Sequence, residues 1–143
     1  MFIFVFVLLE YYTKMEKEIQ DIAAKIKNGG LVCLYGNLGS GKTTYTQKLA
    51  TALGIDGFKV KSPTYSYIRK YDINPKQSLY HIDLYRLEEP DRNIIEEVRE
   101  ILENEKNIVV IEWADRIKEY LPAEKIEIEI TLGPNNQRKI RIY

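Results

Sequence analysis

Apolar side chains recur at helical spacing near the beginning of the chain. They mark one helix face at Met15, Ile19, Ile22, Ala23 and Ile26. Thr13 and Glu16 form the pattern of a capping box, in which both side chains bond to the free amides at the start of a helix. The sequence Asn-Gly-Gly at 28–30 ends the pattern. We therefore predict an amphipathic helix that starts just after Thr13.

An uninterrupted apolar segment, Phe2–Leu9, precedes this helix. It has eight residues, whereas a membrane-spanning helix needs about 20. A secretory signal peptide would have a basic start and a small-residue cleavage site, and the segment has neither. We interpret it as a buried strand. A true start of translation at Met15 is the alternative for the residues before it.

Two further apolar runs have the length of strands. Residues 31–35 and 108–111 are continuously apolar, which is typical of strands covered on both faces of a sheet. A helix is predicted after the first run, with Tyr45 and Leu49 on its inner face. Gly54 lies where the C-terminal cap of that helix belongs.

The middle of the chain has the pattern of short strands separated by turns. We predict strands at 58–60, 65–71 and 79–84. Ser62-Pro63-Thr64 separates the first two of these strands, and residues 72–76 form a turn.

The last part of the chain begins with a helix and ends with a hairpin. Residues 126–132 and 139–142 alternate between apolar and charged side chains around a turn at 133–136, and their charged faces carry opposite signs. The helix is expected after Pro90-Asp91, where apolar residues again recur at helical spacing. These are Ile94, Ile95, Val98, Ile101 and Leu102.

The composition is that of a folded protein without a strong overall charge. With 143 residues, 45% of them apolar, the chain suits one domain, residues 1–143, and excludes a disordered or fibrous protein. Its 21 basic and 21 acidic residues balance, so no overall field draws it to nucleic acid or to an anionic membrane. The single cysteine, Cys33, cannot form an internal disulfide, and we expect a cytoplasmic protein.

Residues 36–43, Gly-Asn-Leu-Gly-Ser-Gly-Lys-Thr, match the P-loop pattern and lie between a predicted strand and a predicted helix. In such a loop, backbone amides surround phosphate oxygens and the helix N-terminus adds positive potential. Lys42 would bridge the β- and γ-phosphates, and the Thr43 hydroxyl would bind Mg²⁺. The sequence therefore predicts an α/β, P-loop NTPase-like three-layer domain, with a mostly parallel sheet and an antiparallel C-terminal hairpin.

A P-loop enzyme also needs an acidic residue at the end of a neighbouring strand, to hold the metal ion and orient the attacking water. Glu112 directly follows the run 108–111, and Asp83 lies near the end of the strand at 79–84. We favour Glu112 as the metal-linked or base-like residue and Asp83 as a second acid in the same cleft. A structural role stays open for both, for Asp83 that of a solvated or helix-starting carboxylate.

Two other polar residues give weaker signals. Pro63 fixes the backbone so that Thr64 is presented from a rigid corner, where it could sense a γ-phosphate, although a simple turn fits the pattern equally well. His81 is the only histidine. Because no second His or Cys is nearby, we interpret it as a structural or supporting residue and not as a zinc ligand.

Four segments taken together are similar to one protein family. They are residues 34–44, Lys61-Ser62-Pro63-Thr64-Tyr65, His81-Ile82-Asp83-Leu84-Tyr85-Arg86-Leu87 and Ile111-Glu112-Trp113. In this order and spacing they resemble the TsaE family of bacterial P-loop ATPases, which take part in tRNA threonylcarbamoyladenosine biosynthesis. The resemblance extends from about Ile19 to Trp113.

This resemblance implies a set of site residues. The Mg²⁺ contacts would fall on Thr43 and Glu112, and the catalytic group would comprise Glu112, Asp83, Lys42 and the switch-like Thr64. Tyr12 and Thr13 would help to enclose the adenine, in the stretch where the chain departs most from the family. The family's usual acid at the second loop position is Asn37 here. The nucleotide loop would comprise Asn37, Leu38, Gly39, Ser40, Gly41, Lys42, Thr43 and Thr44.

The resemblance further implies that the protein binds ATP and Mg²⁺ and joins the partner proteins TsaB and TsaD. That assembly places a threonylcarbamoyl group on adenosine beside the anticodon, and tRNA would be bound through the complex. The P-loop protein would not be the transferase. Its ATP cycle would reset the assembly between turnovers.

Two alternatives remain at this point. A small-molecule kinase shares the P-loop but needs mobile arginines to clamp the transferred phosphate, and only Arg86, Arg92 and Arg99 lie between the candidate acids. In a non-hydrolysing interaction module, ATP would only stiffen a docking surface. Such a module would tolerate Glu112→Ala but not Lys42→Ala.

Overall fold

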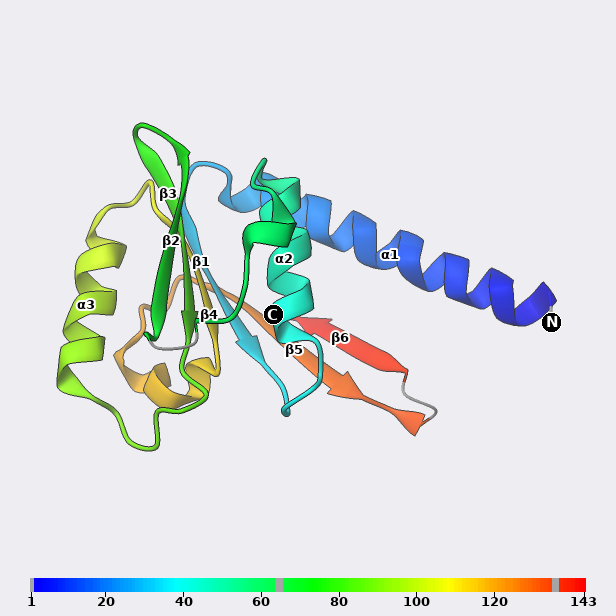
Figure 1. Cartoon of the computed structure of the whole chain (residues 1–143). Coiled ribbons are helices and arrows are strands. Elements are labelled where there is room, and N and C mark those ends of the chain that lie inside the picture. Colours follow the sequence, from blue (N-terminus) through cyan, green and yellow to red (C-terminus); the bar gives the residue numbers. More distant parts are fainter. Residues whose placement is uncertain (1, 64–65, 135–136) are drawn as a thin grey trace.

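The computed structural model describes residues 2–63, 66–134 and 137–143, and its strands form one mixed sheet (Figure 1). The strand order is β2-β3-β4-β1-β5-β6. The pairs β3–β4, β4–β1 and β1–β5 are parallel, and β2–β3 and β5–β6 are antiparallel. The strand bounds are β1 Gly30–Tyr35, β2 Ile68–Asn74, β3 Gln77–Asp83, β4 Ile108–Glu112, β5 Ile126–Leu132 and β6 Arg138–Ile142.

The mostly parallel sheet and the antiparallel C-terminal pair are confirmed. In the C-terminal pair, Glu129 lies opposite Arg141, so the predicted opposite charges face each other. The antiparallel pair at the other edge is an addition, because β2 and β3 form a hairpin around a turn at Pro75-Lys76.

Helices cover both faces of this sheet, as the three-layer prediction requires (Figure 1). One core joins α1 and α2 to one face, and a second core joins α3 and η2 to the other. The central strand β4 is buried along its whole length because it has neighbours on both sides and helices on both faces. The helix bounds are α1 Phe2–Ile26, α2 Lys42–Ala52, α3 Arg92–Glu103, and the 3₁₀ helices η1 Gly57–Lys59 and η2 Ala114–Tyr120.

Helix α1 differs from the prediction at its start. The predicted buried strand at Phe2–Leu9 is wrong, since these residues are helical and exposed. The predicted cap at Thr13 and Glu16 is also wrong, because both residues lie inside the helix and the Thr13 hydroxyl donates to the carbonyl of Leu9 at 2.8 Å. The inner face at Met15–Ile26 is confirmed.

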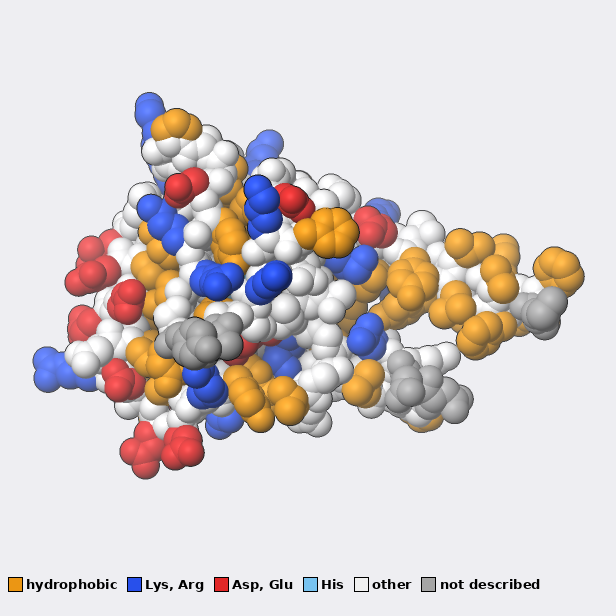
Figure 2. Space-filling model, in the orientation of Figure 1, with side chains coloured by type: hydrophobic (Ala, Val, Ile, Leu, Met, Phe, Trp, Pro, Cys, Tyr) orange, Lys and Arg blue, Asp and Glu red, His pale blue; other side chains and the backbone are white. Residues whose placement is uncertain are grey.

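The exposed part of α1 projects away from the sheet, and Figure 2 shows apolar side chains around it. None of the helices in the described ranges is long and apolar enough to cross a membrane.

The segment after α2 also differs from the prediction. Instead of a strand at 58–60, the chain forms the 3₁₀ turn η1, because the Asp56 side chain accepts a hydrogen bond from the Phe58 amide at 3.1 Å. Strand β2 begins at Ile68, later than predicted, and runs into the predicted turn as far as Asn74. Thr64 and Tyr65 lie outside the described residues.

Candidate nucleotide-binding site

The loop between β1 and α2 has the backbone of a phosphate-binding turn. Gly36 has a φ of 150°, and a Cβ there would collide with the carbonyl oxygen of Ile130. Gly41 has a φ of 104° and caps the N-terminus of α2, which follows directly at Lys42. Gly36 and Gly41 therefore occupy positions where a side chain would be strained or would clash. They leave the amides at the start of α2 open to a ligand.

Lys42 is folded back over this loop. Its ammonium group donates to the carbonyls of Gly36 at 2.6 Å and Asn37 at 2.8 Å, and it lies 3.3 Å from the hydroxyl of Ser40. It also lies 4.4 Å from the centre of the Trp113 ring. Burial lowers the pKa of Lys42, although neighbouring carboxylates oppose that shift. The lysine is thus a desolvated cation, held where a phosphate would compete with two carbonyls for its protons.

Thr43 and Glu112 join the start of α2 to the end of β4. The Thr43 hydroxyl donates to Glu112, with Oε1 at 3.0 Å and Oε2 at 3.3 Å. The hydroxyl of Ser62 lies 2.9 Å from the same Thr43 oxygen. Glu112 is only 2% exposed, and its Oε2 also bonds to Nε2 of the buried His81. A hydroxyl and a carboxylate are oxygen donors of the kind that Mg²⁺ prefers, so this pair could hold such an ion.

Asp83 lies beside Glu112 at the same edge of the sheet, because β3 and β4 are parallel and the two acids are register partners. Its Oδ1 accepts a hydrogen bond from the Tyr85 amide at 3.0 Å. Burial raises the pKa of the Asp83 carboxyl, and the nearby charge of Glu112 adds to this shift. The two acids predicted from the sequence therefore meet in one place.

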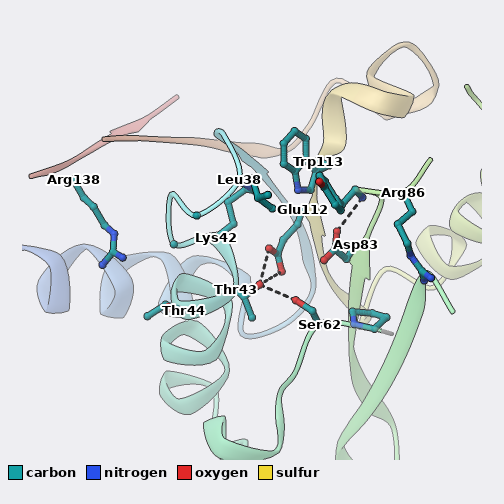
Figure 3. Close-up of a pocket in the computed structure, with 14 residues that line it drawn as sticks. Leu38, Lys42, Thr43, Thr44, Ser62, Asp83, Arg86, Glu112, Trp113 and Arg138 are labelled. Atoms are coloured by element: carbon teal, nitrogen blue, oxygen red, sulfur yellow. Dashed lines mark hydrogen bonds between the residues drawn. The ribbon is translucent and has the colours of Figure 1, made fainter. Parts of the chain in front are cut away.

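These side chains line a cavity of about 550 Å³. Figure 3 shows Thr43, Ser62, Glu112 and Asp83 converging there, with Arg138 reaching in from the opposite side. Six of the eight predicted loop residues line it, namely Leu38, Gly39, Gly41, Lys42, Thr43 and Thr44. Asn37 and Ser40 instead line an adjacent cavity.

Two expected site residues outside the loop, Tyr12 and Thr13, are not brought to this cavity. Tyr12 is 54% exposed on α1, and Thr13 bonds within the same helix. Neither is among the residues that line the cavity. Thr64 lies outside the described residues, next to Pro63, which does line it.

Sequence reasoning missed several residues of the site. Ser62 contacts Thr43, and Arg138 comes from β6 to lie beside Gly41. Trp113 has a φ of 58°, unusual for a residue other than glycine, and packs against Tyr85 at 5.2 Å between ring centres. Ser62, Tyr85 and Trp113 lie within the segments that resemble the family, although only other residues of those segments were assigned to the site. Arg138 lies outside these segments.

The sheet, the glycine loop at the end of β1 and the Lys-Thr pair that starts α2 together define a P-loop domain of the α/β class. Comparison with known proteins narrows this class. The family model for "Threonylcarbamoyl adenosine biosynthesis protein TsaE" matches residues 9–140. This chain therefore belongs to the TsaE family. The match is wider than the stretch over which the sequence motifs extend.

Individual relatives agree with this assignment. The chain is 38% identical over 138 residues to the tRNA threonylcarbamoyladenosine biosynthesis protein TsaE of Aquifex aeolicus, covering 96% of this chain and 94% of that one. It is 36% identical over 119 residues to the protein of the same name from Bacillus subtilis, covering 82% and 72%. Among solved structures, the crystal structure of Bacillus subtilis YdiB matches with a TM-score of 0.66 at 29% identity, covering 90% of this chain and 76% of that one.

Proposed function

We propose that this protein binds ATP with Mg²⁺ and hydrolyses it as an accessory component of tRNA threonylcarbamoyladenosine biosynthesis. The names of its relatives support the pathway. The observation that carries the ATPase part is the hydrogen bond from the Thr43 hydroxyl to the buried Glu112 carboxylate, because it pairs the two residue types that hold Mg²⁺ in P-loop enzymes.

Binding would use the parts of the loop that the fold already holds open. The free amides at the start of α2 would receive the phosphate oxygens, and Lys42 would exchange its carbonyl partners for them. Because Lys42 is buried, its charge acts on a phosphate with little screening by water. Arg138 adds a second cation from the far side of the cavity (Figure 3).

Thr43 and Glu112 would hold the metal ion, directly or through water. When bound, Mg²⁺ would neutralise the charge that develops on the phosphates. Both oxygens of Glu112 are engaged in hydrogen bonds, which suits an anchor for the ion better than a freely moving base.

Asp83 is the better candidate to accept the proton of the attacking water. It faces the same cavity, and its raised pKa makes its ionised form a stronger base than an ordinary aspartate. We assign Glu112 to the metal and Asp83 to the water on this basis.

The proposed partners are TsaB and TsaD, with tRNA bound through the complex, and the proposed compartment is the cytoplasm. ATP turnover should be measured for this protein alone and with both partners, with Lys42→Ala as the control. We expect turnover that the partners stimulate and that Lys42→Ala abolishes. Turnover that ignores the partners would contradict the accessory role.

Two further readouts separate the alternatives, namely γ-phosphate transfer to an acceptor and tRNA modification in the presence of the partners. Transfer of the γ-phosphate to a nucleoside or nucleotide would favour a kinase. Support of tRNA modification by Glu112→Ala, together with failure of Lys42→Ala, would favour a non-hydrolysing module.

A further inference from the structure

His81 is a buried polar residue whose side chain contacts the Glu112 carboxylate of the site. It lies in β3 with 0% exposure, between Tyr80 and Ile82, and its register partner in β4 is Val110. Side chains alternate between the faces of a strand, so His81, Val110 and Glu112 share the face of the sheet that α2 covers. Its Nε2 bonds to Oε2 of Glu112.

The environment of the other ring nitrogen of His81, Nδ1, indicates which partner donates in this hydrogen bond. Nδ1 is buried and has no hydrogen-bond partner among the described residues. A proton on Nδ1 would therefore be buried without an acceptor, while Nε2 would present a lone pair to a carboxylate oxygen. Both arrangements are costly. The ring thus carries its proton on Nε2 and donates it to Glu112.

This donation restricts the way in which Glu112 can point. Its Oε2 is held by His81 from β3, and its Oε1 receives the Thr43 hydroxyl at 3.0 Å from α2. The carboxylate plane is then fixed by two elements that are far apart in sequence. A glutamate without the histidine could turn about its side-chain bonds and leave Thr43.

We propose that His81 is a positioning residue that orients the Glu112 carboxylate toward Thr43 and so sets the affinity of this site for a divalent cation. The inference rests on the proposed Mg²⁺–nucleotide function and deepens it. Residues that donate hydrogen bonds to metal ligands generally change metal affinity by about 10- to 100-fold when they are replaced.

The first test uses the fact that the chain has a single histidine. Long-range ¹H–¹⁵N NMR of the nucleotide-free protein should show a proton on Nε2, and Glu112→Gln should shift the Nε2 signal. A ring protonated on Nδ1 alone would overturn the proposal. This readout needs neither nucleotide nor metal, so it decides the contact even if the proposed function fails.

The second test measures Mn²⁺ binding by electron paramagnetic resonance in the presence of ADP. His81→Leu keeps an apolar side chain of similar size but removes the donor, and we expect Mn²⁺ to bind at least about tenfold more weakly. His81→Gln places an amide donor near the position of Nε2, and we expect affinity within about threefold of the wild type. ADP binding in EDTA should be the same in all three proteins.

The outcomes are distinct. If the wild type binds no Mn²⁺ with ADP, the proposed function is wrong. If the wild type binds and a folded His81→Leu binds equally well, the role of His81 is wrong. If His81→Leu does not fold, His81→Asn, whose amide is one methylene short of Glu112, takes its place beside His81→Gln. Equal affinity of these two amide variants would then overturn the proposal.

Discussion

Glu112 and Asp83 end neighbouring parallel strands as register partners, and yet the fold gives them different surroundings. Glu112 is almost fully buried and bonds to Thr43 and His81. Asp83 is partly exposed, accepts a bond from the Tyr85 amide, and has a pKa raised by burial. Strand position alone therefore makes a carboxylate available, while the hydrogen-bond donors around it decide whether it is held rigidly or left able to exchange a proton.

The largest effect is expected from removing the charge of the rigid carboxylate. Glu112→Gln keeps the size and hydrogen-bonding capacity of the side chain but weakens its hold on a cation. We expect Mg²⁺-dependent ATP turnover to fall at least about 100-fold. Binding of ATP in EDTA should be unchanged, which a calorimetric titration can check. A variant with turnover near that of the wild type would remove the metal role of Glu112.

A smaller loss of ATP turnover is expected when the second carboxylate, Asp83, is replaced. Asp83→Asn removes the proposed proton acceptor and leaves Thr43 and Glu112 in place, so we expect turnover to fall about 10- to 100-fold while Mg²⁺–ATP affinity changes little. Steady-state kinetics with a parallel binding titration separates the effect on turnover from the effect on Mg²⁺–ATP affinity. A loss confined to metal affinity would show that the two acids share one role.

The thermal stability of Asp83→Asn gives a second test of the difference between Asp83 and Glu112. The folded state raises the pKa of Asp83 above its unfolded value, so ionising Asp83 disfavours folding; this cost is absent at low pH and complete above the folded pKa. We expect Asp83→Asn to raise Tm at pH 7. The difference should shrink as pH falls toward about 4. A Tm difference that is independent of pH would show that ionisation of Asp83 is not its source.

The smallest effect is expected outside the acid pair. Tyr12 does not line the cavity, so Tyr12→Ala should leave ATP affinity within about twofold of the wild type. A large loss of affinity would show that the resemblance-based prediction for Tyr12 is right and that α1 reaches the adenine in the bound state.

Local patterns predicted much of the fold. The helix face at Met15–Ile26 was predictable because a single buried face leaves a periodic apolar signal. The strand before Glu112 was predictable because its continuous apolar run is too short for a buried helix. Phe2–Leu9 was misassigned because an apolar run without polar interruption has the same pattern in a helix and in a strand. The false cap at Thr13 arose because the residues before it continue the helix, which leaves its hydroxyl bonded to Leu9.

The site likewise contains residues that the sequence predicted and contacts that it did not. The P-loop and the two acids were predictable because each belongs to a short motif or to the end of a strand. The bonds from His81 to Glu112 and from Ser62 to Thr43, and the approach of Arg138 to Gly41, were not predictable. They depend on the strand order and on the packing of α2, which no local pattern contains.

The most direct test of the central claim is the fluorescence of Trp113 during a titration with ATP, in Mg²⁺ and in EDTA. Trp113 is the only tryptophan in the chain and lies over Lys42 at the cavity. We predict a saturable change in emission that occurs at lower ATP concentration with Mg²⁺, and that Glu112→Gln loses this dependence on Mg²⁺. Emission that ATP and Mg²⁺ leave unchanged would contradict the assignment of this cavity as the nucleotide site.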